Sequence, residues 1–185
     1  GEIGLVLERS CFYAEAGGQV GDGGMITSKD GGSFVVKTTE KVADCVVHRG
    51  KLAEGTLEAG REVTATVDRN REASKKNHTA THLLQWALRD VLGDSVQQQG
   101  SLVSPEYLRF DFTYPKAMTG REVKRVEHLV NEKIKEAVPV GCRVMAIDEA
   151  RQLGAMSLFN EKYGDEVRVI AIGAAGDNDL QDAFS

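Results

Sequence analysis

The sequence predicts an α+β fold, in which a small N-terminal β-barrel precedes a two-layer α+β domain with a long histidine-bearing helix. Two observations support this class. The first third of the chain consists of short segments rich in Val, Ile, Phe and Thr, separated by glycine-rich turns, as is typical of strands. Two segments with apolar residues at helical spacing follow. We expect the boundary near Val67, which gives a glycine-rich barrel subdomain at 1–67 and an α+β subdomain at 68–185.

The expected barrel contains several short strands joined by tight turns. Val63, Ala65 and Val67 alternate with polar residues, which is the period of a strand with one buried face. The segment Lys29–Gly32 reads KDGG and predicts a hairpin turn. The strand segments are Ile3–Glu8, Gly24–Thr27, Ser33–Lys41, Cys45–His48 and Glu62–Val67. So many short strands in a small region favour a barrel or a sandwich.

A long helix is predicted from Arg69 to Leu92, with Asp68 as its N-cap and Gly93 as its end. Its apolar residues recur every three or four positions and form one stripe, which is typical of a helix packed on a core. The stripe consists of Ala80, Leu83, Leu84, Ala87, Leu88, Val91 and Leu92. After it, Leu108–Tyr114 alternates and predicts a strand.

A second helix is predicted over Gly120–Ala137. Thr119 and Glu122 stand in capping-box order at its start. An apolar stripe follows, made of Val123, Val126, Val130 and Ile134. The last predicted elements are a strand at Cys142–Ile147, a short helix at Asp148–Leu153 and a strand at Val167–Ile172.

The composition excludes several classes of protein. The net charge of −5 argues against general binding to nucleic acid, so any RNA contact needs a local basic patch. The three cysteines are odd in number and far apart, which argues against a disulfide framework and favours a reducing cytoplasm. No apolar run reaches transmembrane length, and we expect no membrane partner. The chain begins with Gly1 and no Met, which we interpret as a piece of a longer polypeptide.

Two histidines of the long helix are candidate metal ligands. His78 and His82 lie four residues apart, roughly opposite the apolar stripe, so the helix presents them without needing them for packing. Imidazoles at this spacing can reach one zinc ion. The zinc-peptidase version of the motif has a glutamate where this chain has Thr79, so a peptidase is not expected. The alternative is a pair of ordinary surface histidines.

Two further segments have both a functional and a structural interpretation. A basic run precedes the histidines and either contacts RNA phosphates or is a solvated helix face; it consists of Arg69, Arg71, Lys75 and Lys76. The glycine-rich segment Ala14–Gly24 either approaches a ligand through its backbone or simply turns tightly. It lacks the order of a dinucleotide-binding loop.

Long, ordered segments of the chain resemble the editing domain of alanyl-tRNA synthetase. They read CFYAEAGGQVGDGG, NHTATHLLQWALRDVLG, QQGSLVSPEYLRFDFTYPKAMT and FNEKYGDEVRVIAIG. Free-standing alanyl-tRNA deacylases share the glycine-rich and H-x-x-x-H elements. The resemblance implies an ester hydrolase that removes serine or glycine from mischarged tRNA for alanine, as part of an alanine-tRNA ligase.

The resemblance also implies roles for individual residues. His78 and His82 match zinc ligands that act together with a later Cys and His of a C-G-G-T-H motif. Thr81 and Gln98 match positions that line the editing pocket and are the candidate catalytic residues. The candidate contacts to the aminoacylated 3′ end of the tRNA are Gly17, Gly18 and Gln19, with the four cations of the basic run on phosphates.

The chain departs from the resemblance after Gly173, where it continues as GAAGDNDLQDAFS and stops before a C-G-G-T-H motif. We therefore expect zinc in the intact parent synthetase and weak or absent zinc, with low activity, in this chain. The expected partners are the tRNA for alanine and the remainder of the parent synthetase. Two alternatives stay open: a free-standing deacylase acting in trans, and a tRNA-binding module without hydrolytic activity.

Overall fold

The computed structural model describes residues 1–153 and 165–172. The segment 173–185, where the resemblance ends, and part of the FNEKYGDEVRVIAIG segment lie outside the described residues. The chain divides into two compact units, one of residues 1–82 and 100–111 and the other of residues 83–99 and 112–185. Strands and helices both contribute, so the predicted α+β class is confirmed. The predicted division into subdomains at 1–67 and 68–185 stays a prediction.

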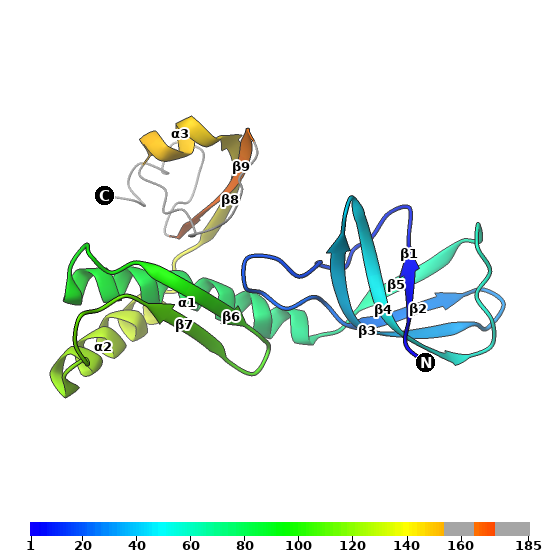
Figure 1. Ribbon diagram of the computed structural model, residues 1–185, viewed down its shortest axis with the longest axis horizontal. Coiled ribbons are helices and arrows are strands. Elements are labelled where there is room, and N and C mark those ends of the chain that lie inside the picture. Colours follow the sequence, from blue (N-terminus) through cyan, green and yellow to red (C-terminus); the bar gives the residue numbers. More distant parts are fainter. Residues whose placement is uncertain (154–164, 173–185) are drawn as a thin grey trace. The chain divides into compact units, whose positions relative to one another are not determined.

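The first unit contains a five-stranded antiparallel sheet with the order β1-β4-β3-β2-β5 (Figure 1). Its strands are β1 (Ile3–Val6), β2 (Gly24–Ser28), β3 (Ser33–Val42), β4 (Cys45–Glu54) and β5 (Val63–Val67). Among the described residues, β1 and β5 are the two ends of this order, and no pairing between them closes the sheet into the predicted barrel. Each strand begins at its predicted start or one residue after it.

The sheet forms because alternate side chains of neighbouring strands meet on one face. Phe12, Ile26, Phe34 and Val36 are buried together, and Ile26 faces Phe34 across the β2–β3 pair. The predicted hairpin turn at 29–32 joins these strands and is confirmed. Strand β4 continues six residues beyond the predicted end at His48. These last residues pair with β3, although most of their side chains are exposed.

The long helix α1 (Asn70–Leu92) begins one residue after the predicted start and ends as predicted at Gly93, whose φ of 99° is left-handed. Ahead of it, the carbonyl oxygen of Asp68 accepts from the N–H of Arg71 at 3.2 Å, which starts the first turn. Two strands follow and pair with each other, β6 (Gln98–Val103) and β7 (Leu108–Phe112). The boundary between the two compact units falls within α1 and within β6.

The second unit contains α2 (Gly120–Glu136), which has the predicted capping box. Thr119 Oγ1 accepts from Glu122 N–H at 3.2 Å, and Glu122 Oε2 accepts from Thr119 N–H at 2.6 Å. The apolar stripe of α2 is only partly buried: Val126 is buried, but Val123 and Ile134 are 48% and 54% exposed. Within the described residues, nothing covers the whole stripe.

The end of the described chain contains β8 (Val140–Ala146), α3 (Ile147–Gln152) and β9 (Glu166–Ile172). The two strands pair antiparallel, and a small core forms from Met145, Ala150, Val169 and Ala171. This arrangement confirms the predicted strand, short helix and strand. In the part of the chain that the structure describes, no helix is both long enough and apolar enough to cross a bilayer.

Candidate active site

Helix α1 buries polar side chains as well as its apolar stripe. Ser74, Thr81 and Gln85 are only 4%, 4% and 7% exposed, and they recur at helical spacing along the side that carries His78 and His82. The two histidines are themselves half-buried. The side of α1 opposite the apolar stripe is therefore not simply a solvent-exposed face. A helix face that buries hydroxyl, amide and imidazole groups costs stability unless they are hydrogen-bonded, so this face needs an explanation beyond packing.

The rings of His78 and His82 lie next to each other. Their centroids are 5.3 Å apart and their planes differ by 18°, so the rings are stacked. Burial lowers the pKa of His82 below its ordinary value of 6.5, and the neighbouring His78 lowers it further when it is charged. At neutral pH, His82 is therefore an uncharged imidazole, which is the form that binds metals and accepts hydrogen bonds.

Gln19 of the glycine-rich segment holds the ring of His78. The side-chain oxygen Oε1 of Gln19 lies 2.7 Å from Nδ1 of His78. An amide oxygen only accepts, so Nδ1 carries the proton and, in the neutral ring, Nε2 carries the lone pair. A metal-binding histidine is typically oriented by this kind of contact to its other nitrogen. Gln19 is 5% exposed, so the contact is shielded from water.

The backbone around Gln19 is fixed by β6. Val103 N–H donates to the Gly18 carbonyl oxygen at 2.8 Å, and Val20 N–H donates to the Val103 carbonyl oxygen at 3.0 Å. Gly18 has a φ of 78°, and a Cβ added to it would lie 2.6 Å from the carbonyl oxygen of Ser101. Glycine is needed here for close approach of two backbones. Contact of Gly17 and Gly18 with substrate stays a prediction.

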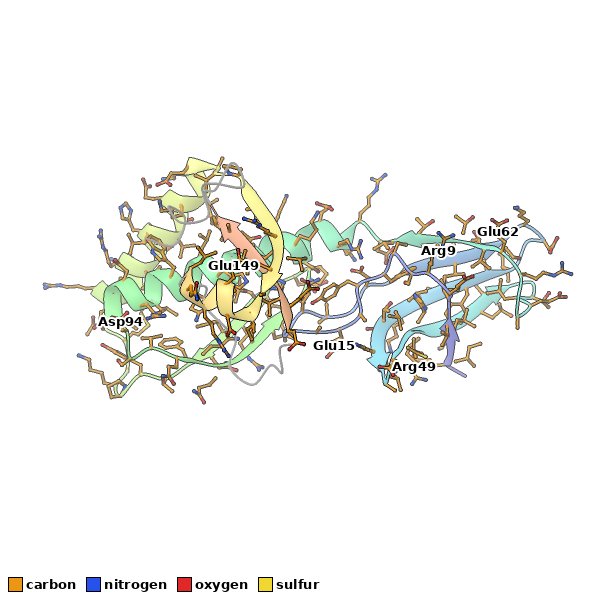
Figure 2. All side chains as sticks on the ribbon, turned by 90° about the horizontal axis from the view of Figure 1, so that it is seen from above. Arg9, Glu15, Arg49, Glu62, Asp94 and Glu149 are labelled. Atoms are coloured by element: carbon orange, nitrogen blue, oxygen red, sulfur yellow. The ribbon has the colours of Figure 1, made fainter. Side chains whose placement is uncertain are left out.

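The same segment is tied to the first turn of α1 by a buried ion pair. Asp22 is 6% exposed, and its Oδ2 accepts from Tyr13 N–H at 2.7 Å and from the guanidinium of Arg71. Arg71 also donates to the Cys11 carbonyl oxygen at 2.7 Å. Figure 2 labels Glu15 on this stretch of chain, and its N–H donates to the Thr39 carbonyl oxygen at 2.9 Å. These bonds anchor both ends of the turn that carries Gln19.

The four cations of the basic run have different surroundings. Arg71 is paired with Asp22, and Lys75 is paired with Glu72 at 3.1 Å. Arg69 and Lys76 are exposed. The structure thus gives Arg71 a structural role that the sequence alone does not predict. Contact of this run with RNA phosphates stays a prediction.

The two candidate catalytic residues are both buried. Thr81 donates its hydroxyl to the Asn77 carbonyl oxygen at 2.9 Å, and Asn77 in turn donates to the Ser104 carbonyl oxygen at 2.8 Å. Gln98, which belongs to the second compact unit, is 9% exposed. Its Oε1 has no hydrogen-bond partner among the described residues. A buried acceptor without a donor is costly, and such atoms often mark binding sites.

The pair of histidines does not by itself make a metal site. Among the residues that the structure describes, no group of three or more His, Cys, Asp or Glu side chains is placed to hold a metal ion. Cys11 and Cys45 are exposed. Two imidazoles, one of them oriented by an amide, are ligands that zinc accepts, but a zinc site takes three or four protein ligands. Zinc binding stays a prediction.

Comparison with known proteins identifies the class that the chain resembles. A family model described as tRNA synthetases class II (A) matches residues 1–71, which cover the sheet and the glycine-rich segment. Among individual proteins, the chain is similar to alanine–tRNA ligases over nearly all of its length. It is 54% identical to that of Acetivibrio thermocellus over 92% of the chain, and 50% identical to that of Parvibaculum lavamentivorans over 96%.

The alanine–tRNA ligase of Thermotoga maritima is also 50% identical, over 93% of the chain. In each case the match covers 20% of the relative, so the chain spans about a fifth of the length of these ligases. These matches include His78 and His82, which the family model does not reach. They show a close similarity to alanine–tRNA ligases.

Proposed function

We propose that this chain is the editing module of an alanine–tRNA ligase, which hydrolyses the ester of seryl- or glycyl-tRNA for alanine. The observation that carries the proposal is the hydrogen bond between Gln19 and His78, residues 59 positions apart. It joins the glycine-rich segment to the histidine helix, the two segments on which the resemblance to editing domains rests. The similarity to alanine–tRNA ligases supports the same substrate.

Such an activity is needed because an alanine pocket cannot reject every wrong amino acid by binding. Glycine is one methyl group smaller than alanine, and a missing methyl changes the binding free energy by only about 1–3 kcal/mol. A pocket likewise rejects an added hydroxyl, as in serine, only weakly. A second site that hydrolyses the wrong ester removes the remaining errors.

The chemistry is the addition of water to an ester. The water oxygen bonds to the carbonyl carbon of the aminoacyl group, the bond from that carbon to the ribose oxygen breaks, and the ribose hydroxyl leaves with a proton. His78 and His82 would hold a zinc ion, which supplies polarisation of the ester or activation of the water when bound. Gln19 would keep His78 in the tautomer whose Nε2 has the free lone pair that binds a metal.

Thr81 and Gln98 are assigned to recognition of the aminoacyl group. The orphan Oε1 of Gln98 is a buried acceptor, and both the serine hydroxyl and the α-ammonium group are donors that would satisfy it. Thr81 already donates its proton to Asn77, so its oxygen acts as an acceptor. We place the module in the cytoplasm, with tRNA and the remainder of a ligase as partners.

Single-turnover hydrolysis tests the proposal. The chain, in excess, is mixed with seryl-, glycyl- or alanyl-tRNA for alanine, with and without added zinc, and ester loss is followed. We expect faster loss of the seryl and glycyl esters than of the alanyl ester, and no such difference with H78A/H82A. Equal rates for the three esters, or equal rates for the parent and the variant, would reject the editing function. Binding of tRNA without hydrolysis would favour a module that only binds.

A further inference from the structure

Helix α2 carries a basic face that the proposed function does not use. Arg121, Lys124, Arg125 and His128 follow the spacing i, i+3, i+4 and i+7, which places them on one side of a helix. All four are exposed. Val130 lies nine residues after Arg121, half a turn round the helix, and Val126 on the same side is buried. The basic face therefore points away from the side on which α2 packs.

Among the described residues, Arg121, Lys124 and Arg125 differ from other cations of the same helix in having no ion-pair partner, whereas His128 lies near Glu132. Lys133 pairs with Glu136 at 2.8 Å, and Lys135 pairs with Glu132 at 3.0 Å. Within the part of the chain that the structure describes, no carboxylate forms an ion pair with Arg121, Lys124 or Arg125. These three side chains keep their full charge available to a partner, although the whole chain has a net charge of −5.

Helix stability does not explain these residues. Positive side chains in the first turns of a helix oppose its dipole, which favours acidic groups there. Arg121 is the second residue of α2, and Lys124 and Arg125 follow within the next turn. The start of the helix is stabilised by the capping box of Thr119 and Glu122 instead. The basic residues are thus slightly unfavourable for the helix itself, which points to a role in binding.

An extended polyanion fits this surface. Arg121 to His128 cover about 10 Å along the helix at about 1.5 Å per residue, a length that spans two or three successive phosphates of a nucleic-acid strand. Arg and Lys are the usual partners of backbone phosphates. Insertion into an anionic membrane would instead need a wholly free apolar side, whereas this side of α2 is only partly exposed: Val126 is buried, and Val123 and Ile134 are 48% and 54% exposed.

We propose that the face of α2 formed by Arg121, Lys124, Arg125 and His128 binds the phosphate backbone of the tRNA. This inference rests on the proposed function, which supplies tRNA as the polyanion. It places a tRNA contact on α2 in addition to the basic run that precedes His78. The contact is independent of sequence, because phosphates carry no base identity.

The experiment measures binding of uncharged tRNA for alanine to the chain between about 50 and 200 mM salt, a range over which phosphate contacts dominate affinity. The test variant is R121Q/K124Q/R125Q. The matched control is K29Q/K37Q/K133Q, which removes the same charge from three lysines that have ion-pair partners and lie off this face. Unfolding curves check that each variant is folded. If the triple test variant does not fold, the single variants R121Q and R125Q take its place.

We expect the test variant to bind about tenfold more weakly at low salt, and its slope of log affinity against log salt to be shallower by about 2–3, roughly 0.7–0.9 for each lost contact. The control should change both much less. Equal effects of the two triple variants would overturn the inference, as would binding to phosphatidylserine vesicles in the absence of tRNA binding. If the test variant alone loses tRNA binding and the parent chain hydrolyses no ester, the tRNA-binding surface on α2 is supported and the editing function is rejected.

Discussion

Two histidine sites in the first compact unit show how the same residue type serves different purposes. His48 is completely buried, and both of its ring nitrogens bond within the sheet region. Its Nδ1 donates to the Leu5 carbonyl oxygen at 3.0 Å, and its Nε2 accepts from the Ser10 hydroxyl at 2.7 Å. The edge of Phe12 packs against it with ring centroids 5.0 Å apart. His48 therefore joins β1, β4 and the start of the glycine-rich segment.

His78 and His82 have a different environment. They are half-buried, stacked on each other, and oriented by the side chain of Gln19 rather than by a backbone carbonyl. Under the proposed function, the difference teaches that burial alone does not separate a structural histidine from a functional one. The two kinds of site differ in their hydrogen-bond partners. His48 contacts the Leu5 carbonyl and the Ser10 hydroxyl, whereas His78 contacts the side-chain amide of Gln19.

The first prediction concerns His48 and has the largest expected effect. H48A leaves the Ser10 hydroxyl and the Leu5 carbonyl without their partner and opens space beside Phe12, so we expect a loss of about 3 kcal/mol of unfolding free energy. Urea denaturation measures it. H128A, at an exposed position of α2, is the control and should change stability by about 0.5 kcal/mol or less. Similar small losses in both variants would show that His48 is not a structural anchor.

The second prediction is that removing the histidine pair affects hydrolysis strongly and stability only slightly, the reverse of H48A. We expect H78A/H82A to lower hydrolysis of seryl-tRNA by at least about 100-fold, as for loss of a group essential to catalysis. Its unfolding free energy should fall by only about 1 kcal/mol, because both rings are half-exposed. Rates and urea curves of the same samples give both values. A stability loss as large as that of H48A, with rates unchanged, would make the pair structural.

The third prediction tests the link between Gln19 and His78. Nitrogen NMR of the metal-free chain should show the proton of His78 on Nδ1. Q19A should shift it toward a mixture of tautomers and slow hydrolysis by about 10-fold, in the range for loss of a group that orients a metal ligand. Q19E supplies an acceptor at the same place and should restore the tautomer. An unchanged tautomer in Q19A would show that the hydrogen bond does not control the ring.

Much of the fold is predictable from the sequence because its signals are local. The capping box of Thr119 and Glu122 and the glycine that ends α1 depend on neighbouring residues only. The end of β4 is not predictable in this way, since its exposed residues after His48 show no apolar alternation and are held by pairing with β3. Closure of the sheet into a barrel also depends on long-range pairing. The strand pattern predicts a closed barrel, but the described strands β1 and β5 do not pair with each other.

The site is less predictable than the fold. The spacing of His78 and His82 and the resemblance indicate where it lies, but the sequence predicts Gln19 as a substrate contact and contains no signal for its bond to His78. That bond arises because Val103 and Ser101 of β6 pack against Gly18, across more than 80 residues. The burial of polar residues on α1 is not predictable for a similar reason: an amphipathic pattern does not show which distant segments contact this side, such as Gln19 at His78.

The last prediction has the smallest effect and concerns the pH dependence of stability in the metal-free chain. Burial, then the charge of His78, lowers the pKa of His82 in the folded state below its ordinary value of 6.5. Above that value the ring is neutral in both the folded and the unfolded chain, so it causes no pH dependence. As the pH falls below 6.5, the unfolded chain takes up a proton that the folded chain does not, and this uptake favours unfolding. The cost grows until the pH reaches the folded pKa and is constant below it. We therefore expect unfolding free energy, measured with chelator present, to fall more steeply below pH 6.5 in the parent than in H82Q, which has no titrating ring. Parallel pH profiles for the two proteins would show that the ring of His82 is not held neutral by its surroundings.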